Sequence, residues 1–234
     1  MISSNCKVQN EPNINKYNKS KVTLASVAGS ALGIAGSVAG VYAMAKKGNP
    51  ALTLSKLAYG EKDALLIGTG AVLGGLAGGL IADDNKENIV PKLREASQQL
   101  IGNTLFPIST LALGNKLLEK SNFKLPKINS NSKPAKIANV VLSFLPKAAV
   151  TLISLTGGMA VGNKVMNIVN NKIFKEEVKH QVKPEDMLVH SDDICLTASM
   201  LLKDSKTISS VVSKALPLSF IVSGAKTGMQ QKEC

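Results

Sequence analysis

The stretch that decides the fold is residues 64–82, ALLIGTGAVLGGLAGGLIA, which carries no charge and contains six glycines. In water, each glycine weakens a helix by roughly 1 kcal/mol relative to alanine. In lipid, backbone groups must satisfy their hydrogen bonds within the helix, so the helix holds despite its glycines. About 20 apolar residues cross the hydrocarbon layer of a bilayer. We therefore interpret this run as a membrane-spanning helix.

The glycines of this run recur at helical spacing. Gly70, Gly74 and Gly78 lie four residues apart and so share one face, and Ala71, Gly75 and Gly79 form a second row beside it. An earlier charge-free run, residues 22–45, carries matching small residues. Small-xxx-small faces let helix backbones approach closely in lipid. The pattern predicts an antiparallel glycine-zipper hairpin whose packing residues are Gly29, Gly33, Gly36, Gly40, Gly70, Gly74, Gly75, Gly78 and Gly79.

Three further low-charge runs follow, at residues 96–115, 137–163 and 207–225. The run at 96–115 is less hydrophobic, because it includes Gln98, Gln99 and Asn103. We predict an all-α membrane protein with several segments: a polar tail over 1–21, the hairpin over 22–82, a third apolar helix with its flanks over 83–120, a linker over 121–136, and a second helical half over 137–234 that includes a charged amphipathic segment at 164–206.

The composition favours lipid over nucleic acid as the partner. The net charge is +12, but Arg94 is the only arginine and aromatic residues make up 3% of the chain. Proteins that read nucleic acids use arginine for bidentate contacts and aromatic rings for stacking. A solvated lysine surface without a partner is the alternative. The three cysteines are widely separated, which predicts neither a disulfide framework nor a metal site.

The charges of the connecting segments orient the spans only in part. Residues 116–136 carry six lysines and one acid, which places that loop in the cytoplasm. Alternation then places the N-terminal tail, with four lysines, on the opposite side, against the same rule. The sequence Ala43-Met44-Ala45 resembles a signal-peptide ending, but the run before it is long, and we expect a retained helix. We predict an integral, multi-pass protein, with a soluble helical bundle as the alternative.

Four ionisable residues are candidates for polar positions within the membrane: Lys147, Lys214, Asp192 and Asp193. Charged groups inside a span are costly and are functional hypotheses by default. An interfacial position for Lys147 is the simpler interpretation. His190 could meet Asp186 on a helix, although a solvated acidic turn explains both residues more simply. The chain has no P-loop, GxSxG or HExxH motif, and we expect no catalytic residue, metal or cofactor.

These observations predict a non-catalytic membrane protein with a structural or interaction role, assembled through small-residue helix faces. Its expected partner is membrane lipid, and no nucleic acid is expected. The glycine faces could pair with a second copy of the chain, and packing within one chain is the simpler interpretation. The alternative is a small pore or transporter in which the two lysines and the two aspartates line a path. A membrane-embedded enzyme that uses His190 is a third interpretation.

Overall fold

The computed structural model describes residues 12–57, 59–121, 123, 125–130, 132–175 and 206–231, and this part of the chain contains helices and no strand. The first helix, α1, runs from Pro12 to Gly48, and the second, α2, runs from Glu61 to Ala82. Proline suits the first helical position, and Lys46 and Lys47 lie in the last turn of α1, where cations favour the helix dipole. The Gly48-Asn49-Pro50 sequence then ends α1.

After α2 the chain turns and forms a second continuous helical arm. This arm consists of a short 3-10 turn, η2 (Lys86–Asn88), the helix α3 (Ile89–Ser97), the π-helical segment η3 (Gln98–Leu105) and the helix α4 (Phe106–Ser121). The next helix, α5 (Lys133–Val169), continues into a π-helical turn, η4 (Asn170–Phe174). Ser132 caps α5 by accepting a hydrogen bond from the Ala135 N–H. The last described helix is α8 (Lys206–Met229).

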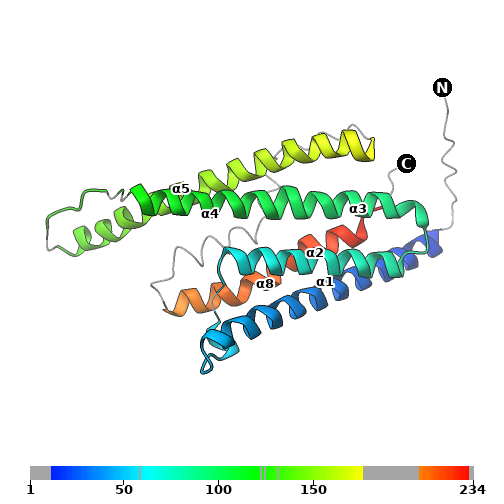
Figure 1. The fold of residues 1–234 in the computed structure, drawn as a ribbon, viewed down its shortest axis with the longest axis horizontal. Helices are drawn as coiled ribbons and strands as arrows, with labels where there is room; N and C mark the ends of the chain where they lie inside the picture. The colour runs from blue at the N-terminus through cyan, green and yellow to red at the C-terminus, as the bar shows by residue number, and fades with distance from the viewer. Residues whose placement is uncertain are drawn as a thin grey trace.

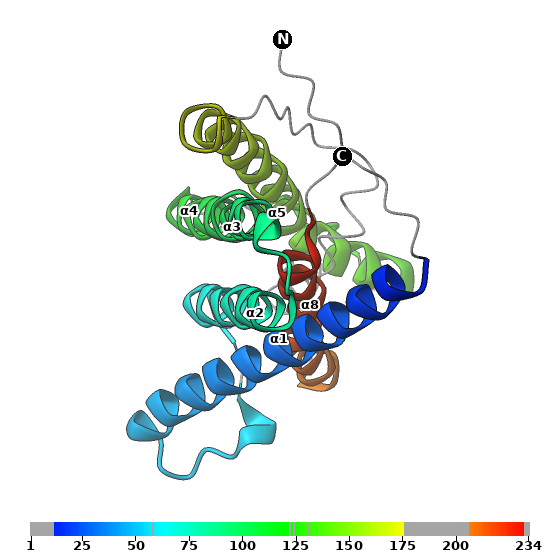
Figure 2. The ribbon, with the colours of Figure 1, turned by 90° about the vertical axis from the view of Figure 1, so that its right-hand side faces the viewer.

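The helices form two groups that lie side by side (Figures 1 and 2). In the first group, α1 and α2 are antiparallel, and α8 packs against both of them. In the second group, α4 and α5 pack as an antiparallel pair. The apolar core joins the two groups, and its buried members come from five helices: Ile34, Ala64, Ile67, Ala71, Ile108, Leu111, Leu155 and Phe220.

Three helical stretches are long and apolar enough to cross a membrane: Asn18–Gly48, Glu61–Ala82 and Leu145–Phe174. The predicted runs at 96–115 and 207–225 are not among them in the described part of the chain. Gln98, Gln99 and Asn103 lower the mean hydropathy of the first of these runs. In the 18-residue apolar window of these stretches, 22%, 39% and 28% of the residues are buried, respectively.

Candidate functional site

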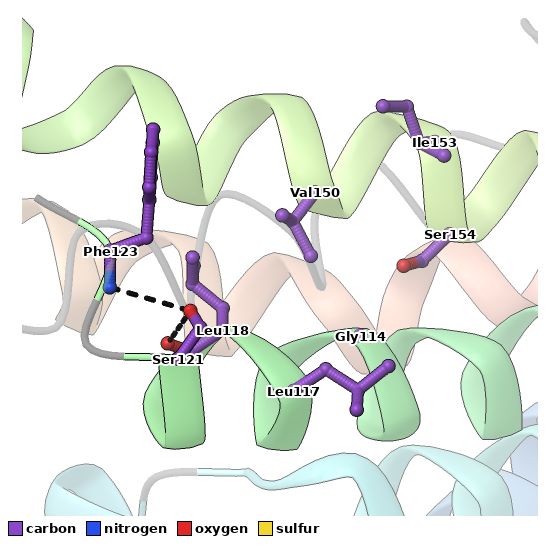
Figure 3. A pocket seen from close by; sticks show the side chains of 8 residues that line it. All are labelled: Gly114, Leu117, Leu118, Ser121, Phe123, Val150, Ile153 and Ser154. Carbon is purple, nitrogen blue, oxygen red and sulfur yellow. Dashed lines mark hydrogen bonds between the residues drawn. The ribbon is translucent and has the colours of Figure 1, made fainter. Parts of the chain in front are cut away.

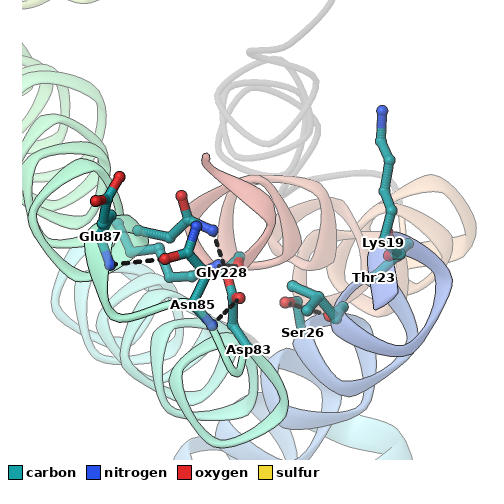
Figure 4. A network of polar contacts seen from close by, with 10 residues as sticks. Lys19, Thr23, Ser26, Asp83, Asn85, Glu87 and Gly228 are labelled. Atoms are coloured by element: carbon teal, nitrogen blue, oxygen red, sulfur yellow. Dashed lines mark hydrogen bonds and ion pairs between the residues drawn. The ribbon is translucent and has the colours of Figure 1, made fainter. Parts of the chain in front are cut away.

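A buried lysine lies at the end of the bundle where α2 and α8 both finish. The side chain of Lys92, in the first half of α3, is 0% exposed, and its Nζ lies 2.9 Å from Asp83 Oδ2. Lys92 Nζ also donates a hydrogen bond of 2.5 Å to the Gly228 carbonyl. The Asp83 side chain is 3% exposed. Figure 4 shows Asp83 and Gly228 facing each other at this junction, with Asn85 beside them.

The position of Lys92 follows from the ends of the neighbouring helices. Asp83 directly follows the last residue of α2, and Gly228 lies in the last turn of α8. The carboxyl ends of helices carry partial negative charge, so both helix dipoles favour a cation between them. A buried lysine without a partner would be strongly destabilising. Lys92 therefore ties α3 to the ends of both α2 and α8.

The surroundings of Asp83 stabilise its charged form. Its Oδ1 accepts a hydrogen bond from the Asn85 N–H at 3.0 Å, and its Oδ2 accepts one from Asn88 Nδ2 at 2.9 Å. Burial acts to raise the pKa of Asp83, but the hydrogen bonds from Lys92, Asn85 and Asn88, together with the charge of Lys92, outweigh it. The pKa of Asp83 is therefore lowered, and the pair with Lys92 is ionic at neutral pH.

The same face of the arm carries a second polar cluster. Lys92, Glu95, Gln99 and Asn103 recur at helical spacing and share one face. Gln99 Nε2 donates to Glu95 Oε1 at 2.8 Å, and Asn103 Nδ2 donates to Gln99 Oε1 at 3.1 Å. Lys226 of α8 pairs with Glu95, with its Nζ 3.5 Å from Glu95 Oε1. We call the four residues Lys92, Glu95, Gln99 and Asn103 the polar seam.

Beside the polar seam, buried amides face α5. Gln98 Nε2 donates to Asn163 Oδ1 at 2.8 Å, but Gln98 Oε1 has no hydrogen-bond partner among the described residues. Asn170 is 0% exposed, and within the same part of the chain neither polar atom of its side chain has a partner. Leaving a buried polar group unsatisfied costs about 1–3 kcal/mol. Gln98 and Asn170 begin the π-helical segments η3 and η4, a conformation that is frequent at functional sites.

Small residues bring α1 and α2 into backbone contact. A Cβ atom built on Gly29 would overlap the Gly74 carbonyl, and one built on Gly33 would overlap the Gly70 carbonyl. Gly78 meets Ala25 in the same way. Because the residue numbers rise on α1 as they fall on α2, the contact is antiparallel. A side chain at any of these positions would push the helices apart.

Two of the predicted packing positions differ from the rest. A Cβ atom at Gly36 or at Gly40 would meet nothing within 4 Å in the described part of the chain. These two glycines therefore make no close contact with α2 among the described residues. The row that contacts α2 continues from Gly33 to Ser37, whose Oγ lies beside Gly70. Gly36 lies outside that row, and Gly40 lies beyond the region of close approach.

The second glycine row of α2 packs against α8, a contact that the sequence analysis did not predict. Gly75 meets the backbone of Gly224, and Gly79 meets that of Gly228. Ser26 and Ser30 of α1 are fully buried and complete this three-helix junction. A Cβ on Gly224 would overlap Ser30 Oγ, and one on Gly228 would overlap Ser26 Oγ. Gly224 and Gly228 are four residues apart, which is the signal that could have revealed this contact.

A further small-residue contact joins the arm to α5. Gly102 faces Gly162, and Gly158 approaches the backbone of Pro107. Thr110 Oγ1 donates to the Ser154 carbonyl at 2.7 Å across the same contact. Sequence analysis missed this row, although Ser154, Gly158 and Gly162 lie four residues apart.

Of the four predicted intramembrane polar residues, only Lys147 has a side chain that the structure describes. Lys147 is exposed on α5, two residues inside the apolar stretch that begins at Leu145. Lys214 lies within α8. Asp192, Asp193 and His190 lie outside the described residues. Among the described residues, the side chains of Asp83, Lys92 and Glu95 are buried, and sequence analysis had assigned them only to the flank of the third apolar helix.

Among the described residues, no group of three or more His, Cys, Asp or Glu side chains could hold a metal ion. Comparisons with protein-family models, with curated proteins and with solved structures find no match for this chain.

Proposed function

We propose that this chain is an integral, multi-pass membrane protein with a non-catalytic structural or interaction role, assembled through glycine-zipper contacts between its helices. Its partner is membrane lipid, and a second copy of the chain is the further expected partner. The buried ion pair between Lys92 and Asp83 holds α3 against the end of α2.

The observation that carries this proposal is the backbone contact of α1, α2 and α8 along glycine and serine. Such a junction buries little apolar side-chain area, and in water hydrophobic burial is the main favourable term. In lipid there is no such term between helices, and close van der Waals packing takes its place. A junction made of small residues is therefore better suited to lipid than to water.

The outward faces of the same helices support the proposal. Leu24 and Leu32 of α1 are 71% and 74% exposed, Ile81 of α2 is 85% exposed, and Ile153 and Ile173 on the α5 stretch are each 69% exposed. Soluble monomers rarely expose large contiguous apolar patches. Large side chains outside and small residues inside are the arrangement expected when the solvent is lipid.

The proposal is tested by washing membranes of cells that express the full chain with alkaline carbonate. An integral protein stays in the pellet through the wash and leaves it only in detergent. Release of the chain into the carbonate supernatant would contradict the membrane assignment and favour a soluble bundle or a peripheral protein. A known peripheral protein and a known integral protein in the same fractions serve as controls.

The polar seam favours a second candidate function, a small pore or transporter. Lys92 and Glu95 are buried on one face of α3, just beyond the apolar stretch of α2, and buried ionisable residues in membrane proteins often mark ion or substrate paths. Proteoliposomes that hold the full chain test this candidate in an ion-flux assay. Ion flux that is present with the native chain and absent with Glu95→Gln would favour transport. Vesicles that remain impermeable to ions and solutes would favour the structural role.

A further inference from the structure

An apolar groove of about 480 Å³ lies between the end of α4 and the facing part of α5 (Figure 3). Leu117, Leu118 and Phe123 line one side of the groove, and Val150 and Ile153 line the other. The groove stays open because its large side chains turn outward: Leu117, Phe123 and Ile153 are 59%, 59% and 69% exposed. Their arrangement leaves an open apolar slot between two helices.

The floor of the groove is narrow because the helices approach closely there. A Cβ atom on Gly114 would overlap Ser154 Oγ and lie 3.1 Å from Val150 Cγ1. Gly114 and Ser154 therefore bring α4 and α5 together, while the branched side chains above them form the walls. A long, thin apolar group such as an acyl chain fits a slot of this form.

The groove lies at one end of the apolar stretches. The α5 stretch begins at Leu145, five residues before Val150, and the α2 stretch begins at Glu61. Asn115, next to Gly114, donates to Glu61 Oε1 at 3.4 Å, so α4 and α2 are level with each other at this point. If these stretches span the bilayer, the groove opens at the boundary between the headgroups and the acyl chains.

Several lysines close in sequence to the residues that line the groove are exposed. Lys147 is exposed on α5 three residues before Val150 and seven before Ser154, so it shares their helix face. Lys116, Lys120 and Lys127 are also exposed, and Glu119 is the only acid among residues 116–136. Basic clusters beside membrane helices attract anionic lipids. Lys147 therefore lies where the phosphate of a phospholipid would lie, and the apolar side chains lie where its acyl chain would lie.

We propose that this groove binds an anionic phospholipid, with one acyl chain in the slot between α4 and α5 and the phosphate beside Lys147. This inference rests on the proposed membrane location. The occupant is a lipid because the slot lies level with the start of two apolar stretches and because the exposed Lys147 shares the helix face of Val150 and Ser154. The site would tie the α4–α5 pair to an anionic leaflet.

The chain has no tryptophan, so one introduced tryptophan reports on its own surroundings. Phe123→Trp places the reporter at the groove, and Leu24→Trp places one on the outward face of α1. Each full-length variant is reconstituted in phosphatidylcholine vesicles that contain phosphatidylglycerol, with bromine on the acyl chains of either lipid. Bromine quenches tryptophan on contact, so the ratio of quenching by the two brominated lipids measures local lipid preference.

The proposal predicts that the Phe123→Trp reporter is quenched more strongly by the brominated anionic lipid, while the Leu24→Trp reporter is quenched equally by both. Adding Lys147→Gln lowers the preference of the Phe123→Trp reporter by about fivefold, the effect expected for one lysine near a charged surface. Lys86→Gln, which removes an exposed lysine at the opposite end of α2, leaves the preference unchanged.

Three outcomes would overturn the proposal. Equal quenching by the two lipids at both reporters would show that the groove has no preference for anionic lipid. Quenching at Leu24→Trp alone would show that protein covers the groove. Absence of quenching at both positions would contradict the membrane location itself, so the failure of the groove and the failure of the proposed function are distinguishable.

Discussion

Lys92 Nζ lies 2.9 Å from Asp83 Oδ2, and both side chains are almost fully buried. Breaking a buried ion pair by removing one partner costs about 3–5 kcal/mol, because it leaves a charge without compensation. We expect Lys92→Met to lower the free energy of unfolding by an amount in that range, measured by denaturant titration in detergent. The double variant Lys92→Met, Asp83→Asn should recover part of the loss, because no charge is then left alone. If the free energy of unfolding of Lys92→Met lies within about 0.5 kcal/mol of the native value, the ion pair does not contribute to stability.

The lowered pKa of Asp83 makes stability depend on pH in acid. The carboxyl of the unfolded chain titrates near its ordinary value of 3.8, and that of the folded chain titrates below it. The unfolded state therefore binds protons first as the pH falls. The contribution of Asp83 is complete above about pH 5 and is lost as the pH falls through the folded pKa. Thermal melts from about pH 6 to about pH 2 should show this loss, and the Asp83→Asn variant should show a smaller one; equal slopes would contradict the account.

Two adjacent glycines of α5 provide a matched pair of substitutions. Among the described residues, a Cβ atom at Gly157 would meet nothing within 4 Å, whereas one at Gly158 would lie 2.7 Å from Pro107 Cα. Gly157→Ala should stabilise the protein by up to about 1 kcal/mol through helix propensity. Gly158→Ala should destabilise it by about 1–3 kcal/mol, because the helices must separate. The measurement is the melting temperature of each variant in the same detergent, and a shift of the same sign in both would count against the proposed packing.

The buried amide of Asn170 predicts an unusual gain of stability. Replacing a buried, unsatisfied polar side chain with an apolar one of similar volume removes its desolvation penalty. Asn170→Leu should therefore raise the free energy of unfolding by about 1 kcal/mol. Gln99→Leu serves as the contrasting variant, since Gln99 bonds to Glu95 and Asn103 and its loss should destabilise the protein. If Asn170→Leu destabilises the protein as much as Gln99→Leu does, Asn170 has a binding partner that the described contacts do not include.

The pairing of α1 with α2 was predictable because it follows a local rule. Gly29 and Gly33 share one face of α1, and Gly70 and Gly74 share one face of α2. In lipid, such faces of small residues favour close packing of two helices. The same rule could not predict that Gly33 contacts α2 whereas Gly36 does not. It depends on where two crossing helices touch, which periodicity alone does not specify.

The burial of the polar seam was not predicted because it depends on contacts with residues far away in the sequence. Lys92 bonds to Gly228, which is 136 residues further along the chain, so its burial depends on where α8 packs. The charges between residues 83 and 99 nearly balance, and a balanced segment resembles an exposed loop. The spacing of Lys92, Glu95, Gln99 and Asn103 along one helix face was the available signal.

The central claim is that α1 and α2 lie in lipid with their backbones in contact. Its most direct test is the stability of Gly74→Leu and Gly36→Leu, each reconstituted in lipid nanodiscs and unfolded by denaturant. Because a side chain at Gly74 would overlap the Gly29 carbonyl, Gly74→Leu should lose about 3 kcal/mol or more, and Gly36→Leu should stay within about 0.5 kcal/mol of the native chain. If Gly74→Leu unfolds at the same denaturant concentration as the native chain, the claim is contradicted.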